Sequence, residues 1–464
     1  MKKLLEVREF DKISCNPDFK TEYAYLPEAV FRDLEQFIHA FAGDEEYADA
    51  LEFLKIGFRR NVGDIISVNN YVGLIQMQNG YQIQVLPKID FGSNPDSKNE
   101  ETKRVFLRML RTMKDFPSKV FNEANLKMDQ MTLYEIFINM YLQEVRALVK
   151  HGIKSNYIGR EDNLSFYKGK LVVNEHIKQN AAHGERFYVH YDEYLVDRAE
   201  NRLVKATLLK LQSITGSAEN QKEIRQLLTA FEMVKPSINH QKNFSRVVID
   251  RSTKDYDMLM RWSRVFLLNK SFTTFSGGTN ARALLFPMEK VFESYVAKQL
   301  KKTLADLDWE ISSQDKGYYL FDSPRQFALR PDIVITREDG SKIILDTKWK
   351  RLVDKPRINY GISQTDMYQM YAYGKKYETS EIWLLYPMNE EMREHQEILF
   401  TSEDGVGVRL FFVDVANIET SLKRLRSQLI ETLSNPQQSW GESCTQVAIT
   451  KATEKNSVVY YVRV

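Results

Sequence analysis

The apolar positions of the chain change their period along its length, and each change predicts a different kind of element. They recur at helical spacing over 27–41 and then alternate with polar positions over 71–89, where Asn79-Gly80 favours a β-hairpin turn. From about 101 to 270 the helical period dominates, most clearly in LYEIFINMYLQEVRALV at 133–149. The chain up to that point is therefore predicted to form a β-containing region followed by a mainly helical one.

Beyond Phe286, short apolar runs alternate with helical patterns. A helix is predicted at 286–304 with Pro287 in its first turn, where a missing backbone N–H costs nothing. Predicted strands follow at 308–313, 318–321, 326–336 and 342–349, then a helix at 363–377, strands at 382–386 and 408–415, and a last helix at 418–433. This order predicts an α/β domain with a mixed central sheet flanked by helices, in a chain that is α+β overall.

These changes of pattern divide the chain into four predicted segments. They are a mixed α/β N-terminal region at 1–95, a mainly helical middle region at 100–275, the α/β domain at 280–433 and a peripheral tail at 434–464. The stretch that follows Phe91 is polar and rich in Gly, Pro, Asn and Ser, which is typical of a linker. A chain of 464 residues is also too long for one ordinary core.

The composition excludes some classes of protein but does not identify a partner. The 65 Lys and Arg residues nearly cancel the 63 Asp and Glu residues, so only a local basic patch could indicate nucleic acid. Two cysteines, Cys15 and Cys444, exclude a disulfide framework and favour a reducing compartment. The N-terminus lacks the apolar core of a signal peptide, and no apolar run approaches the ~18–20 residues that span a bilayer. We expect a soluble cytoplasmic protein.

The stretch ALRPDIVITREDGSKIILDTKWK (328–350) gathers polar residues at the edges of two apolar runs. Successive side chains of a strand point to opposite faces, so Asp346 and Lys348 share one face and Thr347 takes the other. Asp332 lies opposite Asp346 if the connecting loop has three residues, Glu338 to Gly340, whereas a two-residue loop would move Asp332 to the wrong face. A functional interpretation of these residues therefore requires a loop with an odd number of residues, or a bulge with the same effect.

If these side chains converge, their chemistry fits a magnesium site. Two carboxylates a few ångström apart repel each other unless a cation lies between them, and hard oxygen ligands suit Mg²⁺. The carbonyl of Thr347 is a further oxygen, and Glu293 is an additional acid on the helix that opens the domain. Lys348 is placed to orient a water molecule or to stabilise the transition state of phosphodiester cleavage.

A basic patch follows the hairpin directly. Lys350, Arg351, Lys355 and Arg357 are opposed in sequence only by Asp354, so they could hold DNA phosphates in a chain that is nearly neutral overall. Asp and Lys at strand ends are also common in ordinary solvated hairpins. The combination of Pro-Asp, an apolar strand, Asp-x-Lys and a Glu-bearing helix favours the nuclease interpretation over that alternative.

The PD…DTK arrangement in this helix–strand order resembles the PD-(D/E)xK nuclease superfamily. The wider chain resembles the McrC family, the nuclease subunit of McrBC systems that restrict DNA with modified cytosine. Four stretches carry the resemblance: YVGLIQMQNGYQIQVLPKI; FYKGKLVVNEHIKQN with YDEYLVDRAENRLVKATL; FPMEKVFESYV; and RPDIVI…ILDTKWK with MYQMYAYG. One departure is Thr347, which stands where alanine is familiar and whose side chain points away from the predicted site.

The resemblance implies a role for each matching residue. Asp332 and Asp346 would be metal ligands, Lys348 the catalytic lysine, Glu293 the acid on the helix and Gln369 a supporting residue beside the site. The metal would be Mg²⁺, with Mn²⁺ as the alternative. These roles imply an endodeoxyribonuclease whose C-terminal domain has a restriction-endonuclease-like fold.

The resemblance also implies a partner. McrC-like proteins work in a hetero-oligomer with a ring of McrB-like AAA+ GTPase, which recognises the modified site and whose GTP hydrolysis they stimulate through a stalk-like region. The resemblance implies that residues 1–95 bind the partner and that the middle region at 100–275 is the stalk that contacts it. The sequence contains no G-x-x-x-x-G-K-[ST] motif, so GTP would be bound by the partner. Two alternatives remain open: a non-catalytic adaptor of a DNA-defence complex, and a stand-alone repair nuclease that cuts without a partner.

Overall fold

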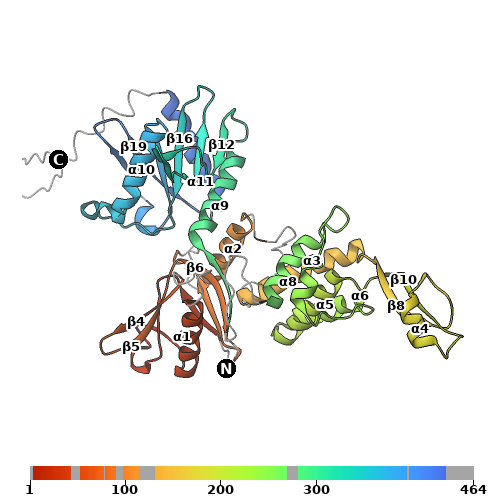
Figure 1. The fold of residues 1–464 in the computed structure, drawn as a ribbon. Helices are drawn as coiled ribbons and strands as arrows, with labels where there is room; N and C mark the ends of the chain where they lie inside the picture. Colours follow the sequence, from red (N-terminus) through yellow and green to blue (C-terminus); the bar gives the residue numbers. More distant parts are fainter. Residues whose placement is uncertain are drawn as a thin grey trace, which may run out of the picture. The chain divides into compact units, whose positions relative to one another are not determined.

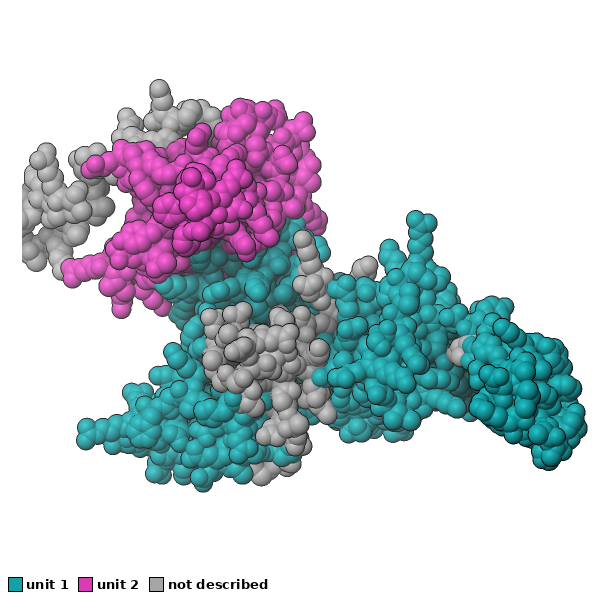
Figure 2. Space-filling view, viewed as in Figure 1, with its two compact units in different colours: residues 1–298, 347–351 teal, residues 299–346, 352–464 magenta. Residues whose placement is uncertain are grey.

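The computed structural model describes residues 4–42, 53–77, 79–89, 98–113, 116, 131–268, 281–393 and 397–434. Contacts divide the chain into two compact units, residues 1–298 with 347–351 and residues 299–346 with 352–464 (Figure 2). The division falls inside helix α9 (Met288–Thr303) and at the end of strand β16 (Lys342–Thr347). The four segments predicted from the sequence are a finer division whose boundaries stay predictions, and the tail beyond 434 lies outside the described residues.

The N-terminal part of unit 1 contains two small sheets. Strands β1 (Leu4–Arg8), β7 (Gln82–Leu86), β6 (Tyr71–Met77) and β11 (Ala281–Pro287) form one of them, in that order (Figure 1). Strands β6 and β7 pair antiparallel around Gly80, whose φ of 79° suits the tight turn, and this confirms the predicted hairpin. The other sheet has the order β3 (Ala24–Tyr25), β2 (Lys12–Ser14), β5 (Gly63–Val68) and β4 (Leu54–Arg59). It shares a core with helix α1 (Glu28–Ala42) through buried residues that include Phe31, Leu34 and Phe37.

The middle part of unit 1 is mainly helical, as predicted. Helix α3 (Leu133–His151) begins at the capping side chain of Thr132 and buries most of its length. It packs with α6 (Ala218–Ala230) and α8 (Tyr256–Leu268), and α8 in turn packs with α5 (Ala199–Ile214). The ring of Trp262 lies fully buried in this helical core, 5.5 Å from the ring of Phe266.

The middle region also contains a sheet that the apolar pattern does not predict. Strands β8 (Asn156–Leu164), β10 (Phe187–Leu195) and β9 (Lys170–Leu171) pair antiparallel, and helix α4 (Val173–Asn180) packs on β10. We call residues 156–195 the middle sheet. Strand β8 carries mostly polar residues and is exposed at 159, 160 and 161 alike, so it lacks the apolar alternation by which a half-buried strand is recognised.

Unit 2 is built on a mixed sheet, as the sequence predicts. Its strand order in the described residues is β12-β15-β16-β17-β19-β18 (Figure 1). The strands are β12 (Glu310–Ser313), β15 (Ile333–Thr336), β16, β17 (Glu381–Pro387), β19 (Gly407–Val413) and β18 (Leu399–Thr401). Helix α10 (Gln364–Lys376) packs on one face through Met370 and Tyr373. Helix α11 (Ile418–Ser434) covers the other face, where Arg424 lies over the ring of Phe411.

Two predicted boundaries are wrong. Pro287 is the last residue of β11, and α9 begins after it at Met288. The predicted strand at 326–336 is two strands: β14 (Arg325–Ala328) pairs only with β13 (Tyr319–Asp322), and β15 starts after Pro331. Phe327 has a φ of 58°, and Pro331 has no N–H for a ladder, so the chain cannot continue as one regular strand. Among the described helices, none is long and apolar enough to cross a membrane.

Candidate functional site

The hairpin of β15 and β16 has the loop that the functional interpretation requires. The two strands pair antiparallel, with Ile333 opposite Leu345 and Thr336 opposite Lys342. The backbone N–H of Arg337 donates to the carbonyl of Ser341 at 2.9 Å, which leaves three residues in the loop. Gly340, the last of the three, has a φ of 82°. The predicted loop of residues 338–340 is therefore confirmed.

This register places Asp332 and Asp346 opposite each other. Asp332 immediately precedes β15, and its carbonyl still accepts the backbone N–H of Gln314 at 2.9 Å, so it continues the sheet alignment. Side chains directly opposite on antiparallel strands lie about 5 Å apart at Cβ, where two like charges destabilise the pair. Asp346 is 2 % exposed. Two carboxylates held in this way fit a divalent cation with oxygen ligands.

Both aspartates lie on the face of the sheet that α10 covers. Val334 and Ile344, two residues from Asp332 and Asp346, pack in the same buried cluster as Met370 of α10. Because a strand alternates its faces, residues 332 and 346 share that face. Helix α10 starts where the Ser363 hydroxyl accepts the backbone N–H of Asp366, a typical N-cap. Helix α10 is therefore ordered from its first turn, and it packs on the side of the sheet where the two carboxylates lie.

Two buried tyrosines interact with these carboxylates. Burial raises the pKa of Tyr373 on α10, and the charges of Asp346 and Asp332 raise it further. The Tyr373 hydroxyl oxygen also accepts a hydrogen bond from the side-chain amide of Gln369 at 2.7 Å. Burial likewise raises the pKa of Tyr386 on β17, followed by the charges of Asp366 and Asp346. Both phenols are therefore kept protonated beside the carboxylates.

The sequence interpretation included neither tyrosine in the site. Tyr373 could have been found, because it lies one helical turn after Gln369 in MYQMYAYG and would share its side of the helix. Tyr386 belongs to a fully buried strand, and nothing in the local pattern distinguishes it from core. The predicted residue Gln369 itself is exposed, and its side-chain amide donates to the hydroxyl of Tyr373.

The remaining predicted residues lie in both units. Glu293 is a half-buried residue on α9 in unit 1, and Lys348 is half-buried one residue beyond the end of β16, also in unit 1. Thr347 is the buried last residue of β16. Of the basic patch, Lys350 and Arg351 belong to unit 1, whereas Lys355 and Arg357 are exposed in unit 2. Within the described ranges, no group of three His, Cys, Asp or Glu side chains is arranged to hold a metal ion.

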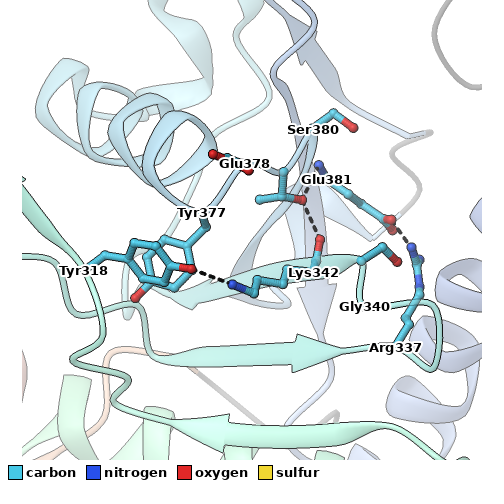
Figure 3. A pocket seen from close by; sticks show the side chains of 10 residues that line it. Tyr318, Arg337, Gly340, Lys342, Tyr377, Glu378, Ser380 and Glu381 are labelled. Atoms are coloured by element: carbon cyan, nitrogen blue, oxygen red, sulfur yellow. Dashed lines mark hydrogen bonds and ion pairs between the residues drawn. The ribbon is translucent and has the colours of Figure 1, made fainter.

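A polar pocket of about 270 Å³ lies at the loop end of the same hairpin. Figure 3 shows Lys342 reaching the hydroxyl of Tyr318, at 2.7 Å, and Arg337 reaching the carboxylate of Glu381, at 2.8 Å. Lys342 also lies over the ring of Tyr377. The cations that line this pocket are thus engaged by neighbouring side chains, which makes it a structural feature of the domain.

A known protein family matches most of the chain. A family model described as McrBC 5-methylcytosine restriction system component matches residues 66–387, which is more than half of the 464-residue chain. The chain belongs to this family. The predicted resemblance is thereby confirmed over the β6–β7 hairpin, the middle region and the hairpin that carries Asp332 and Asp346.

One solved structure shares the fold of this chain over most of its length. A chain in the tetradecameric assembly of Thermococcus gammatolerans McrB AAA+ hexamers with bound McrC matches with a TM-score of 0.69 and 19% identity, over 92% of this chain and 100% of that one. A chain of the Thermococcus gammatolerans McrBC complex matches with a TM-score of 0.47 and 21% identity, over 65% of this chain and 88% of that one. A search of curated proteins gave no significant match.

Proposed function

We propose that this McrBC-family chain is the Mg²⁺-dependent endonuclease subunit of a restriction system directed at modified cytosine. The observation that carries the proposal is the register of the β15–β16 hairpin, which puts Asp332 opposite Asp346 on the α10 face of the sheet. A buried carboxylate facing a second one is costly in a merely structural sheet. A cation between the two carboxylates would remove most of this cost.

In this proposal each predicted residue has a separate task. Asp332 and Asp346 would hold the ion, with the Thr347 carbonyl and Glu293 as further oxygen ligands. When bound, the ion supplies a more acidic water and stabilises negative charge on a phosphate oxygen. Lys348, two residues after Asp346, would orient the attacking water or donate to the phosphate.

Other predicted residues would orient a side chain beside the metal site or hold the DNA backbone. Gln369 would orient the Tyr373 hydroxyl toward the carboxylates. Lys350, Arg351, Lys355 and Arg357 would neutralise phosphates of the bound duplex.

The chain would work with an AAA+ partner that binds and hydrolyses GTP. The Thermococcus gammatolerans relative is seen with McrB AAA+ hexamers, and we propose the same class of partner here. The middle sheet supports this proposal, because it exposes several large apolar side chains on a small element: Tyr157, Phe166, Tyr167, Val173, Ile177 and Tyr194. Large apolar side chains exposed in this number on one small element favour a protein interface. We propose that this surface contacts the ring and stimulates its GTPase.

Asp346→Ala tests the nuclease proposal. The variant should lose DNA cleavage by about 10³-fold or more, because it removes a metal ligand, while still binding the partner and stimulating its GTPase. Asp339→Ala is the matched control, since it removes an exposed carboxylate from the loop of the same hairpin. Cleavage of modified plasmid DNA, co-purification with the partner and GTP hydrolysis are measured together. Unchanged cleavage in Asp346→Ala contradicts the proposal, and GTPase stimulation by a wild-type chain that never cuts DNA indicates an adaptor.

Metal binding can be tested without the partner. Mg²⁺ or Mn²⁺ should raise the Tm of the purified chain, because a ligand that binds only the folded state stabilises it by about 2.7 kcal/mol at a hundredfold excess over Kd. Asp332→Asn should remove this rise and should not lower the Tm in metal-free buffer, since it relieves the repulsion between the two carboxylates. A rise that persists in Asp332→Asn would place the ion elsewhere.

The partner surface is tested by charge insertion. Ile177→Asp puts a carboxylate in the apolar surface of the middle sheet, where Ile177 is 63% exposed, and should weaken co-purification with the AAA+ partner. Ile238→Asp is the control, because Ile238 is 96% exposed in the same region but outside the middle sheet. Equal behaviour of the two variants would contradict the assignment.

A further inference from the structure

The segment that follows Lys348 is held by a glutamate near the N-terminus. Trp349 is 3 % exposed, and its indole N–H donates to both carboxylate oxygens of Glu9, at 3.1 and 3.0 Å. Glu9 is also 3 % exposed and lies 340 residues earlier in the sequence. Both residues belong to unit 1. A buried carboxylate therefore engages the residue next to the predicted catalytic lysine.

A lysine holds the backbone of the same residue. The ammonium of Lys88 donates to the carbonyl of Trp349 at 2.9 Å, and the backbone N–H of Lys88 donates to Glu9 Oε2 at 3.0 Å. The ring of Phe292 packs against the indole at 5.4 Å between centroids. The side chain and the main chain of Trp349 are thus fixed independently, which leaves the chain just after Lys348 little freedom to rotate.

The pairing of β1 with β7 explains why Glu9 and Lys88 meet. These strands run parallel, with Arg8 opposite Leu86, and the backbone N–H of Glu9 donates to the carbonyl of Leu86 at 3.0 Å. Glu9 and Lys88 therefore emerge together where the two adjacent strands end. Their placement is set by the sheet and not by a flexible loop, and rigid elements position side chains more accurately than loops do.

Burying the two ionisable side chains of Glu9 and Lys88 costs the folded chain stability. Burial raises the pKa of Glu9 to about 7, although Lys88 and the hydrogen bonds to Glu9 oppose that rise and Glu289 adds to it. Burial also lowers the pKa of Lys88, and Lys350 lowers it further, while Glu9 and Glu289 raise it. Well-packed apolar side chains commonly replace such groups without loss of stability. A requirement for precise placement of the neighbouring segment explains why polar groups occupy this position.

We propose that Glu9 is a positioning residue for Lys348. By fixing Trp349, it sets the direction in which the preceding residue projects and the position of the Thr347 carbonyl. The inference rests on the proposed function, because Lys348 has a role in catalysis only if the chain cleaves DNA. The hydrogen bonds described for Glu9 join it to Trp349, Lys88 and Leu86, so it would act on Lys348 through the neighbouring residue. Its contribution should therefore appear in the rate of cleavage and not in affinity for DNA.

The test uses the full chain with its AAA+ partner and GTP. Glu9→Ala should slow single-turnover cleavage of modified DNA by about 10²-fold, because small displacements of a catalytic group have effects of this size. DNA affinity and stimulated GTP hydrolysis should not change. Glu9→Gln should recover cleavage to within about fivefold of wild type, since the amide oxygen still accepts the indole N–H.

A matched pair of tryptophan variants controls for loss of stability. Trp349→Phe removes the indole donor beside Lys348, whereas Trp383→Phe removes an equally buried indole that donates to Glu381 at 3.2 Å. The first should slow cleavage and the second should not, once both proteins are shown to be folded. If Glu9→Ala does not fold, the comparison of Glu9→Gln with Trp349→Phe still decides between the outcomes.

A second measurement reports the contact without cleavage. The chain has five tryptophans, so ¹⁹F spectra of 5-fluorotryptophan protein contain few resonances, and the one missing from Trp349→Phe is that of Trp349. This resonance should shift in Glu9→Ala and stay near its wild-type position in Glu9→Gln. A shifted resonance with wild-type cleavage overturns the positioning role and leaves the proposed function intact. A wild-type chain that cuts no DNA under any condition overturns both.

Discussion

Two buried glutamates of this chain each accept an indole N–H, but their charges are balanced differently. In unit 2, Glu381 accepts from Trp383 and also from the guanidinium of Arg337, at 2.8 Å. Arg337 and Glu381 are both about nine-tenths buried, so they form an internal ion pair. In unit 1, Glu9 accepts from Trp349 and from a backbone N–H, and its burial raises its pKa to about 7.

The difference indicates what each pair contributes. Glu381 pairs with the buried guanidinium of Arg337 and so holds the start of β17 to the residue that follows β15. This pair contributes to the stability of the fold. Glu9 lacks such a compensating ion pair in the described contacts, yet it holds the segment that contains Lys348. Strongly perturbed carboxyl groups cluster at functional sites, where geometry is maintained at the expense of stability. The comparison therefore contrasts a stabilising Glu–Trp pair with one that, in our proposal, positions a neighbouring site.

The largest effect on stability is expected at the structural pair. Arg337→Met leaves the carboxylate of Glu381 buried without the guanidinium, which should lower the free energy of unfolding by about 3–5 kcal/mol. Urea denaturation measures this loss. Arg325→Met is the control, because Arg325 is exposed on β14 and should change stability by less than about 0.5 kcal/mol. Equal effects of the two substitutions would mean that the Arg337–Glu381 pair is not structural.

The pH dependence of stability should reveal Glu9. Its carboxyl has a pKa of about 7 in the folded chain against 4.5 as its ordinary value, so the folded state binds this proton more tightly. The corresponding stability is complete below pH 4.5 and is lost as the pH rises through about 7, a change on the order of 3 kcal/mol. Glu9→Gln lacks this titration. The difference in unfolding free energy between variant and wild type should therefore shift in favour of the variant between pH 5 and 8.

Urea unfolding of both proteins at closely spaced pH values measures this difference. Subtracting wild type from variant cancels the titration of the other groups. A difference that does not change with pH would mean that Glu9 is ionised as easily in the folded chain as in the unfolded one, and the contrast with Glu381 would disappear.

The sequence predicts well those elements whose structure is determined by residues close together in the chain. The alternation of IVI and IIL, together with Gly340 in the loop, determines the register, and with it the pairing of Asp332 and Asp346. The helix at 363–377 is equally local, since Ser363 caps it and its apolar residues recur at helical spacing. These predictions needed only strand alternation, turn geometry and capping.

The features that were missed depend on distant or weak patterns. Glu9 and Trp349 are 340 residues apart, and no local pattern links them. Tyr386 looks like any other residue of a buried strand. Strand β8 of the middle sheet is exposed on both sides, so its residues do not alternate between apolar and polar. Tertiary contacts decide each of these cases.

The smallest expected effect tests whether the loop or the strands determine the register. Gly340 has a φ of 82°, and a Cβ built on it meets no atom within 4 Å, so a side chain there has room but strains the backbone. Gly340→Ala should cost about 1 kcal/mol, and Gly340→Asn less, because asparagine adopts positive φ more readily. DNA cleavage should persist in both variants, since the buried IVI and IIL residues oppose a slip that would expose them.

Urea denaturation and plasmid cleavage check these two expectations together. A loss of cleavage in Gly340→Ala with only a small loss of stability would show that the loop holds Asp332 opposite Asp346. A loss of stability near that of Arg337→Met would instead show that the loop is needed to bring Arg337 to Glu381. Because the two results point to opposite ends of one hairpin, this substitution distinguishes the end that carries the carboxylates from the end that carries the structural ion pair.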